Sequence, residues 1–128
     1  MRRKFSHMRI LCADDDPDIR AALELAFSRE ADIEATILAK GLDVLTHAPR
    51  GSWDLIVLDA EMPGLDGYGA CRRLRKDPAT ASTPIVFLTA HTKPGETERA
   101  LELGASGWIG KPFDPLTVVA ALRAAMSR

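Results

Sequence analysis

Polar residues that could carry out chemistry follow four of the short apolar runs in this sequence of 128 residues. Asp14-Asp15-Asp16 follows the first run, Asp59 the third, Thr89 the fourth, and Lys111 comes just after the fifth. Clustered carboxylates repel one another, and their oxygens are ligands that Mg²⁺ prefers. A hydroxyl and an ammonium group suit the oxygens of a phosphoryl group in transfer. These residue types indicate phosphoryl transfer assisted by Mg²⁺, in which one aspartate could be the nucleophile and form an aspartyl phosphate.

Several of these residues also have an ordinary structural interpretation. A single aspartate after a strand is commonly a helix cap, and Asp16 before a proline fits that use. One cap needs one aspartate, so Asp14 and Asp15 are available for another role. Asp59 could belong to the turn that the following Met-Pro-Gly segment forms. Trp108 suits a plain core position and a moving position equally well.

The apolar runs are continuous rather than alternating, which is typical of parallel strands covered on both faces. The distance between successive runs leaves room for one crossover helix. We expect strands over residues 9–13, 33–39, 55–58, 85–88 and 107–109.

Helical patterns fill the intervals between the runs. We expect a helix that opens at Pro17, one over 41–48, one from Tyr68 to the break at Asp77-Pro78, one over 95–103, and one that opens at Asp114-Pro115. The buried face of the last helix is expected to comprise Leu116, Val119, Leu122 and Met126. Alternating strands and helices predict an open α/β sheet with helices on both faces. Ligands of such sheets bind beyond the carboxyl ends of the strands, where the polar residues described above would converge.

Charge and composition exclude several classes of protein. Seventeen Lys and Arg against eighteen Asp and Glu give a formal net charge of −1, which offers neither a basic field for nucleic acid nor a polybasic membrane anchor. No apolar run approaches the length of a transmembrane helix, and the basic start is not followed by the apolar core of a signal peptide. Cys12 and Cys71 are interpreted as buried reduced thiols of a cytoplasmic protein. The three histidines share no metal-ligand spacing.

Four motifs follow one another along the chain. They are Ile10 to Pro17; Asp54 to Asp59 with Met62-Pro63-Gly64 and Asp66-Gly67; Pro84 to Ala90; and Gly104 to Trp108 with Lys111-Pro112-Phe113. With these motifs in this order and at this spacing, the chain resembles the receiver domain of two-component response regulators, from about Arg9 to Met126.

The resemblance implies a fold and a domain boundary. The fold is a flavodoxin-like (βα)₅ doubly wound parallel sheet with strand order 2-1-3-4-5. A tail over residues 1–8 would precede the receiver domain, which would occupy residues 9–128.

The resemblance also implies roles for individual residues. Asp59 would accept a phosphoryl group, Asp14, Asp15, Asp59 and the backbone carbonyl of Glu61 would bind Mg²⁺, and Thr89 and Lys111 would hold the phosphoryl oxygens. The bond between Lys111 and Pro112 would be cis. Trp108 matches the aromatic switch position, where Tyr or Phe is more usual. Glu61 and His91 match variable positions that tune how fast the phosphoryl group is hydrolysed.

The implied activity is that of a signalling module and not of an enzyme. Partners would be a sensor histidine kinase or a phosphotransfer protein, and an effector or a second copy at the face of the fourth helix, fifth strand and fifth helix. We expect no binding to nucleic acid or membrane. A haloacid-dehalogenase-like phosphatase would have a second aspartate two residues after its nucleophile, where this chain has Glu61. A degenerate receiver that acts only as a binding module would lack one of the acidic or lysine residues. The pathway, the kinase, the oligomeric state and any longer parent protein stay open.

Overall fold

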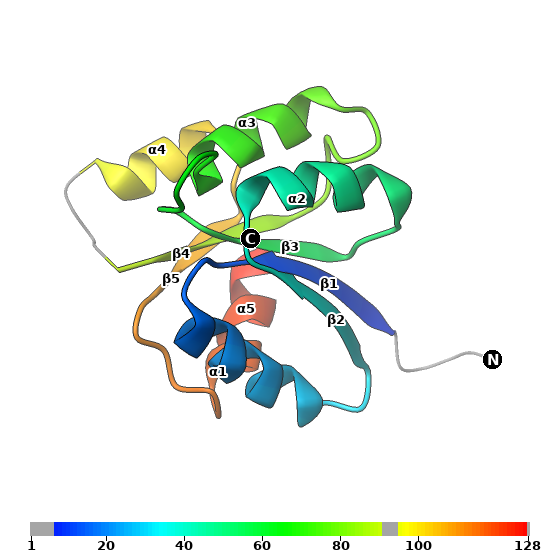
Figure 1. Ribbon diagram of the computed structural model, residues 1–128, viewed down its shortest axis with the longest axis vertical. Coiled ribbons are helices and arrows are strands. Elements are labelled where there is room, and N and C mark those ends of the chain that lie inside the picture. Colours follow the sequence, from blue (N-terminus) through cyan, green and yellow to red (C-terminus); the bar gives the residue numbers. More distant parts are fainter. Residues whose placement is uncertain (1–6, 91–94, 128) are drawn as a thin grey trace.

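Five parallel strands form one sheet in the computed structural model, which describes residues 7–90 and 95–127 (Figure 1). The strands lie in the order β2-β1-β3-β4-β5, as the family resemblance implied. Their bounds are β1 Met8–Ala13, β2 Ile33–Leu38, β3 Leu55–Asp59, β4 Ile85–Thr89 and β5 Gly107–Gly110. Strand β1 begins one residue earlier than we expected and therefore includes the last residue of the expected tail.

Helices cover both faces of this sheet. In Figure 1, α2, α3 and α4 lie on one face, and α1 and α5 lie on the other. Their bounds are α1 Pro17–Ser28, α2 Gly41–His47, α3 Gly67–Lys76, α4 Glu96–Glu102 and α5 Val118–Met126, with a short 3₁₀ helix at Ala48–Arg50. Across the described ranges, no helix has the length and hydrophobicity needed to cross a membrane.

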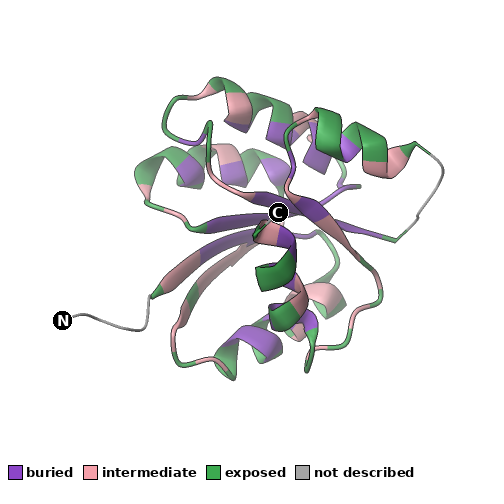
Figure 2. Ribbon diagram, turned by 180° about the vertical axis from the view of Figure 1, so that it is seen from behind, coloured by how far each residue is buried: buried purple, intermediate pink, exposed green. Residues whose placement is uncertain are grey.

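The two faces of the sheet build two hydrophobic cores. On one side, Ile56 and Phe87 of the central strands pack with buried residues of α2, α3 and α4. On the other side, Val57 and Val86 pack with buried residues of α1 and α5. Every residue of β3 and β4 is buried, which explains why these segments are continuously apolar (Figure 2).

Aspartate caps fix where α1 and α3 begin. The side chain of Asp16 accepts a hydrogen bond from the Asp18 amide at 2.9 Å, and that of Asp66 accepts one from the Gly69 amide at 2.8 Å. Each cap satisfies an amide that has no partner inside the helix. The expected capping role of Asp16 is therefore confirmed.

The expected start of the last helix is wrong by several residues. Helix α5 begins at Val118, because Asp114 closes a separate turn ahead of it. The Asp114 carboxylate accepts the Leu116 amide at 2.8 Å, and its carbonyl accepts the amides of Thr117 and Val118, each at 3.0 Å. Leu116 lies in this turn and is 67% exposed, so it does not belong to the buried face where we expected it.

Gly67 makes a close approach that holds α3 against the end of β3. A Cβ atom at this position would collide with the backbone carbonyl oxygen of Asp59. The Gly67 amide also donates a hydrogen bond to the carbonyl of Ala60 at 3.1 Å. The absence of a side chain thus lets the first turn of α3 contact the backbone of the strand end.

We expect Gly67→Ala to lower the free energy of unfolding by about 1–3 kcal/mol, because the added methyl group must push apart two backbone segments. Chemical denaturation measures this change. The matched control is Gly110→Ala, since a Cβ atom there meets nothing within 4 Å, and its effect should stay within about 0.5 kcal/mol. Equal effects of the two substitutions would show that the close approach is not what makes Gly67 necessary.

Candidate functional site

The candidate site lies at the carboxyl edge of the sheet, where the strand ends bring the polar residues together. Parallel pairing places Ala13 opposite Leu58, Asp59 opposite Leu88, and Thr89 opposite Gly110. Residues at or just after these positions therefore reach the same edge from four different strands.

Lys111 joins two of the carboxylates directly. Its Nζ atom lies 2.9 Å from Asp14 Oδ2 and 3.1 Å from Asp59 Oδ1, and only 13% of its side chain is exposed. The Lys111 amide donates to the carbonyl of Thr89 at 2.8 Å, which fixes the backbone that carries the ammonium group. The bond between Lys111 and Pro112 is cis, as expected.

Asp59 lies at the end of β3 and is almost completely buried. Its Oδ1 also accepts a hydrogen bond from the Glu61 amide at 3.2 Å. Burial and then the negative charge of Asp14 raise the pKa of Asp59 to about 7, although Lys111 and the Glu61 amide oppose this change. Burial alone would lower the pKa of Lys111, but its hydrogen bonds to Asp14 and Asp59 and their charges outweigh that effect and raise it.

Asp14 is fully buried and is held at several atoms. Its Oδ1 accepts the amide of Asp16 at 2.9 Å, its Oδ2 takes the contact with Lys111, and its backbone carbonyl accepts a hydrogen bond from Arg20 Nη1 at 3.0 Å. Asp15 is exposed at the rim of the site. The two neighbouring aspartates therefore have different surroundings, one fixed and one open to solvent.

The acidic residues form a donor set that fits a hard divalent cation. Asp14, Asp15 and Asp59 can each offer one carboxylate oxygen such that these oxygens lie within 4.8 Å of one another. All three ligand atoms would be oxygens, which Mg²⁺ prefers over nitrogen or sulfur. Mg²⁺ commonly binds to a protein through only one or two carboxylates. The residues present at this edge of the sheet therefore suit Mg²⁺.

Thr89 and Trp108 lie beside this acidic cluster on β4 and β5. Thr89 is buried at the end of its strand, while Trp108 is half-buried and packs against the core on the side of α3 and α4. Both residues line a narrow gap whose other walls are Tyr68, Phe87, Glu96, Thr97 and Ala100. Of the two expected tuning residues, Glu61 lies two residues after Asp59 and has an exposed side chain. His91 lies outside the described residues.

Some residues near the site were missed by the sequence analysis. Arg20 contacts the backbone of Asp14 from the end of the first turn of α1. Arg99 of α4 stacks over the ring of Tyr68 at 4.3 Å from its centre, and that ring lies 5.0 Å from the ring of Phe87. The position of Arg20, four residues after the expected cap Asp16, was the available signal, because such a side chain reaches back toward the helix start.

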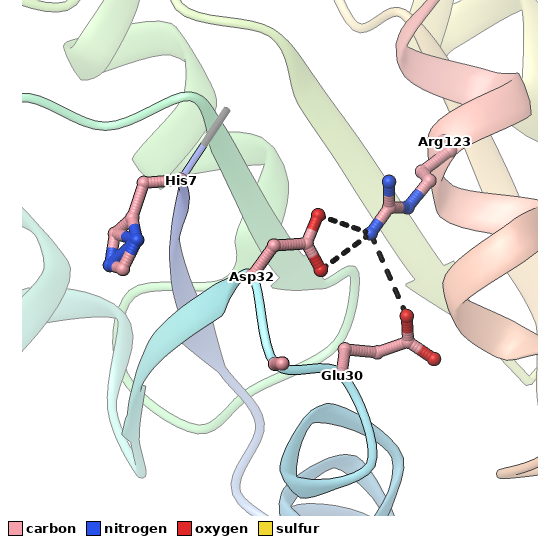
Figure 3. A pocket seen from close by; sticks show the side chains of 5 residues that line it. His7, Glu30, Asp32 and Arg123 are labelled. Carbon is pink, nitrogen blue, oxygen red and sulfur yellow. Dashed lines mark hydrogen bonds and ion pairs between the residues drawn. The ribbon is translucent and has the colours of Figure 1, made fainter. Parts of the chain in front are cut away.

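A larger hollow lies elsewhere on the surface. It has a volume of about 560 Å³ and is lined by His7, Glu30, Ala31, Asp32 and Arg123 (Figure 3). These residues lie just before β1, just before β2 and on α5, at the end of the sheet opposite the carboxyl edge. Arg123 Nη2 lies 3.2 Å from Asp32 and 3.7 Å from Glu30, so its ion pairs join α5 to the turn before β2. The hollow is therefore separate from the acidic cluster.

Comparison with known sequences places this arrangement in a family. The model of the response regulator receiver domain matches residues 10–123. The chain is 35% identical over 121 residues to an uncharacterized transcriptional regulatory protein of Bacillus subtilis, YclJ, and covers 52% of that protein. It is 37% identical over 120 residues to the DNA-binding response regulator MtrA of Mycolicibacterium smegmatis and covers 51% of it. These matches cover 94% of this chain, which thus spans about half the length of the curated relatives named here.

Solved structures agree with the sequence comparison. The chemotaxis protein CheY4 of Vibrio cholerae superposes with a TM-score of 0.86 at 29% identity, covering 94% of this chain and 99% of that one. The receiver domain of the sensor histidine kinase PA1611 of Pseudomonas aeruginosa gives 0.82 at 28% identity, covering 96% and 100%. The acidic edge, the strand order and these matches lead to one conclusion: this chain belongs to the receiver domains of response regulators.

Proposed function

We propose that Asp59 takes a phosphoryl group from a phosphohistidine of a sensor kinase or phosphotransfer protein. The observation that supports this most strongly is the position of its carboxylate, which is buried at a strand end with Oδ1 held by Lys111 and the Glu61 amide. Within the described part of the chain, no donor is recorded on Oδ2. Asp59 therefore has one oxygen fixed and one available for attack.

The phosphohistidine and Asp59 together supply every atom that the transfer needs. One oxygen of Asp59 forms a bond to phosphorus while the bond from phosphorus to the imidazole nitrogen breaks, and the electron pair leaves on that nitrogen. Lys111 moves from a carboxylate toward a phosphoryl oxygen, and the Thr89 hydroxyl binds another. Both groups compensate charge as it develops on the phosphoryl oxygens.

Mg²⁺ would be held by Asp14, Asp15, Asp59 and the backbone carbonyl of Glu61. Receiver domains bind Mg²⁺ at their acidic cluster, and the PA1611 receiver has a magnesium ion in its active site cleft. When bound, the ion supplies positive charge next to the phosphoryl oxygens. Asp15 contributes an exposed ligand that hydrated metal can reach, and Asp14 contributes a buried carboxylate already oriented by Lys111.

Phosphorylation would then change the surface of α4, β5 and α5. Thr89 and Trp108 border the same gap as residues of α4, so a movement of Thr89 toward the phosphoryl group would alter the room available to Trp108. The α4 helix presents Leu101 to solvent with half of its surface exposed. We propose this surface as the binding site of an effector or a second copy, with residues 9–128 acting as one cytoplasmic signalling domain.

The domain would catalyse only its own modification and its reversal. Glu61 begins at the rim of the site, because its amide donates to Asp59 while its side chain is exposed. The long side chain of Glu61 would block the path of the attacking water, and its negative charge would repel the phosphoryl group. His91 is the second residue that we propose to tune the rate of hydrolysis. The phosphorylated form would therefore be long-lived enough for relay to a partner.

Mass spectrometry tests the phosphoacceptor directly. After incubation with acetyl phosphate and Mg²⁺, the wild type should gain one adduct of about 80 Da that is labile in base, as an acyl phosphate is. Asp59→Asn should gain none. Asp43→Asn, which changes an exposed aspartate of α2, is the matched control and should be modified like the wild type. An adduct of the same yield in Asp59→Asn would disprove the assignment.

Calorimetric titration with Mg²⁺ tests the metal site. Asp15→Ala should weaken Mg²⁺ binding by at least about tenfold, since it removes a ligand. The exposed Asp15 side chain has no recorded contact within the described ranges, so the variant should unfold at the same denaturant concentration as the wild type in EDTA. Unchanged Mg²⁺ affinity in this variant would place the metal elsewhere.

The raised pKa of Asp59 predicts how stability depends on pH without metal. From its ordinary pKa of 3.8 up to about 7, the folded chain keeps a proton that the unfolded chain has released. The free energy of unfolding of the wild type in EDTA should therefore fall as pH rises through this range. Asp59→Asn should flatten that decline and raise the melting temperature at about pH 8 by roughly 3–6 °C for each kcal/mol regained. Parallel declines of the two proteins in denaturation experiments would contradict this explanation.

A further inference from the structure

Arg20 of α1 contacts the acidic loop without being one of its acidic residues. Its Nη1 donates a hydrogen bond to the backbone carbonyl of Asp14 at 3.0 Å, and its side chain is half-buried. We propose that Arg20 is a positioning residue, which holds the backbone so that Asp15 presents its carboxylate to Mg²⁺. This inference rests on the proposed function, because it concerns the same metal site.

The bond from Arg20 acts on the backbone carbonyl of Asp14, which the other contacts of this residue do not touch. The Asp16 amide and Lys111 hold the two oxygens of the Asp14 carboxylate, at 2.9 Å each. Arg20 holds the carbonyl instead. This carbonyl and the amide of Asp15 belong to one planar peptide unit, so a bond to the carbonyl fixes the orientation of the whole unit. The orientation of that unit determines the position of the Cα atom of Asp15, from which its side chain starts.

Asp15 depends on this backbone orientation more than its neighbours do. Its side chain is exposed and has no recorded hydrogen bond or ion pair within residues 7–90 and 95–127. Asp14 is buried, and Asp16 caps α1 through its bond to the Asp18 amide. Asp15 is therefore oriented by the backbone on either side of it.

The helix places Arg20 where it can do this. The Arg20 amide donates to the carbonyl of Asp16 at 3.0 Å, so Arg20 stands one turn after the cap. Helical side chains point back toward the amino end, which directs the guanidinium to the loop from Asp14 to Asp16. The guanidinium group of arginine has only N–H donors, and a backbone carbonyl is an acceptor. The two groups therefore suit each other as hydrogen-bond partners.

Electrostatics and positioning predict opposite results when Arg20 is removed. A positive charge close to a cation site repels Mg²⁺, so the loss of charge alone would strengthen Mg²⁺ binding. The loss of the bond to Asp14 would instead free the peptide unit and weaken binding, as the loss of groups that orient metal ligands commonly does. The direction of the change therefore identifies the role.

The experiment compares Mg²⁺ affinity by calorimetry in the wild type, Arg20→Met and Arg29→Met at one ionic strength. Arg29 follows the same helix at its other end, is exposed, and serves as the control for a lost positive charge. We expect Arg20→Met to bind Mg²⁺ about tenfold more weakly and Arg29→Met to bind it like the wild type. Equal or tighter binding by Arg20→Met would overturn the inference.

A second measurement needs neither metal nor phosphorylation. In EDTA, hydrogen exchange of the Asp16 amide, which donates to Asp14 Oδ1, should be faster in Arg20→Met than in the wild type, while exchange in the second half of α1 should be unchanged. Unchanged exchange of the Asp16 amide would overturn the inference, and so would faster exchange along the whole helix, which would indicate general loss of stability. If the wild type itself fails to bind Mg²⁺, the proposed metal site fails, and the exchange data still decide whether Arg20 orders the loop.

Discussion

The ammonium group of Lys111 between the buried carboxylates of Asp14 and Asp59 is the interaction on which the site depends. Two buried carboxylates at this separation repel each other and are costly to desolvate, unless a cation and hydrogen bonds compensate them. Lys111, which directly follows β5, supplies that cation. The backbone amide of Lys111 is held by the carbonyl of Thr89 on β4. The sheet must therefore bring β1, β3 and β5 to one edge in a fixed register, and the helices on both faces maintain that register.

Much of this arrangement could be predicted from the sequence, for physical reasons. Continuous apolar runs identify strands buried on both faces, and the strand ends locate the polar residues that meet. The start of α5 was predicted wrongly, because aspartate is used both in helix caps and in turns, and Asp114 closes a turn. The position of Arg20 after Asp16 allowed a contact with the loop but could not identify it, because an arginine on a helix usually faces solvent and only the coordinates show its bond to Asp14.

Rigid and easily displaced elements meet at this site. Asp59 belongs to a strand that is buried throughout, so its carboxylate starts from a fixed backbone. Helix α4 is seven residues long, and Ala100 is its buried residue. The stacking of Arg99 on Tyr68 adds a contact between α4 and α3. Elements with few buried contacts open at low free energy. The proposed phosphorylation of Asp59 would thus occur at a rigid strand end beside a helix that little energy can move.

The strand order also has a consequence for how copies of the chain meet in a crowded solution. An open sheet has two edges whose backbone groups could pair with another chain and begin aggregation. Strand β5, at one edge, has only four residues and is bounded by two glycines. Strand β2, at the other edge, carries the exposed Glu34, whose carboxylate is 3.2 Å from Arg9 on the neighbouring strand. A short edge and a charged edge both disfavour the addition of a foreign strand, so the sheet resists uncontrolled growth.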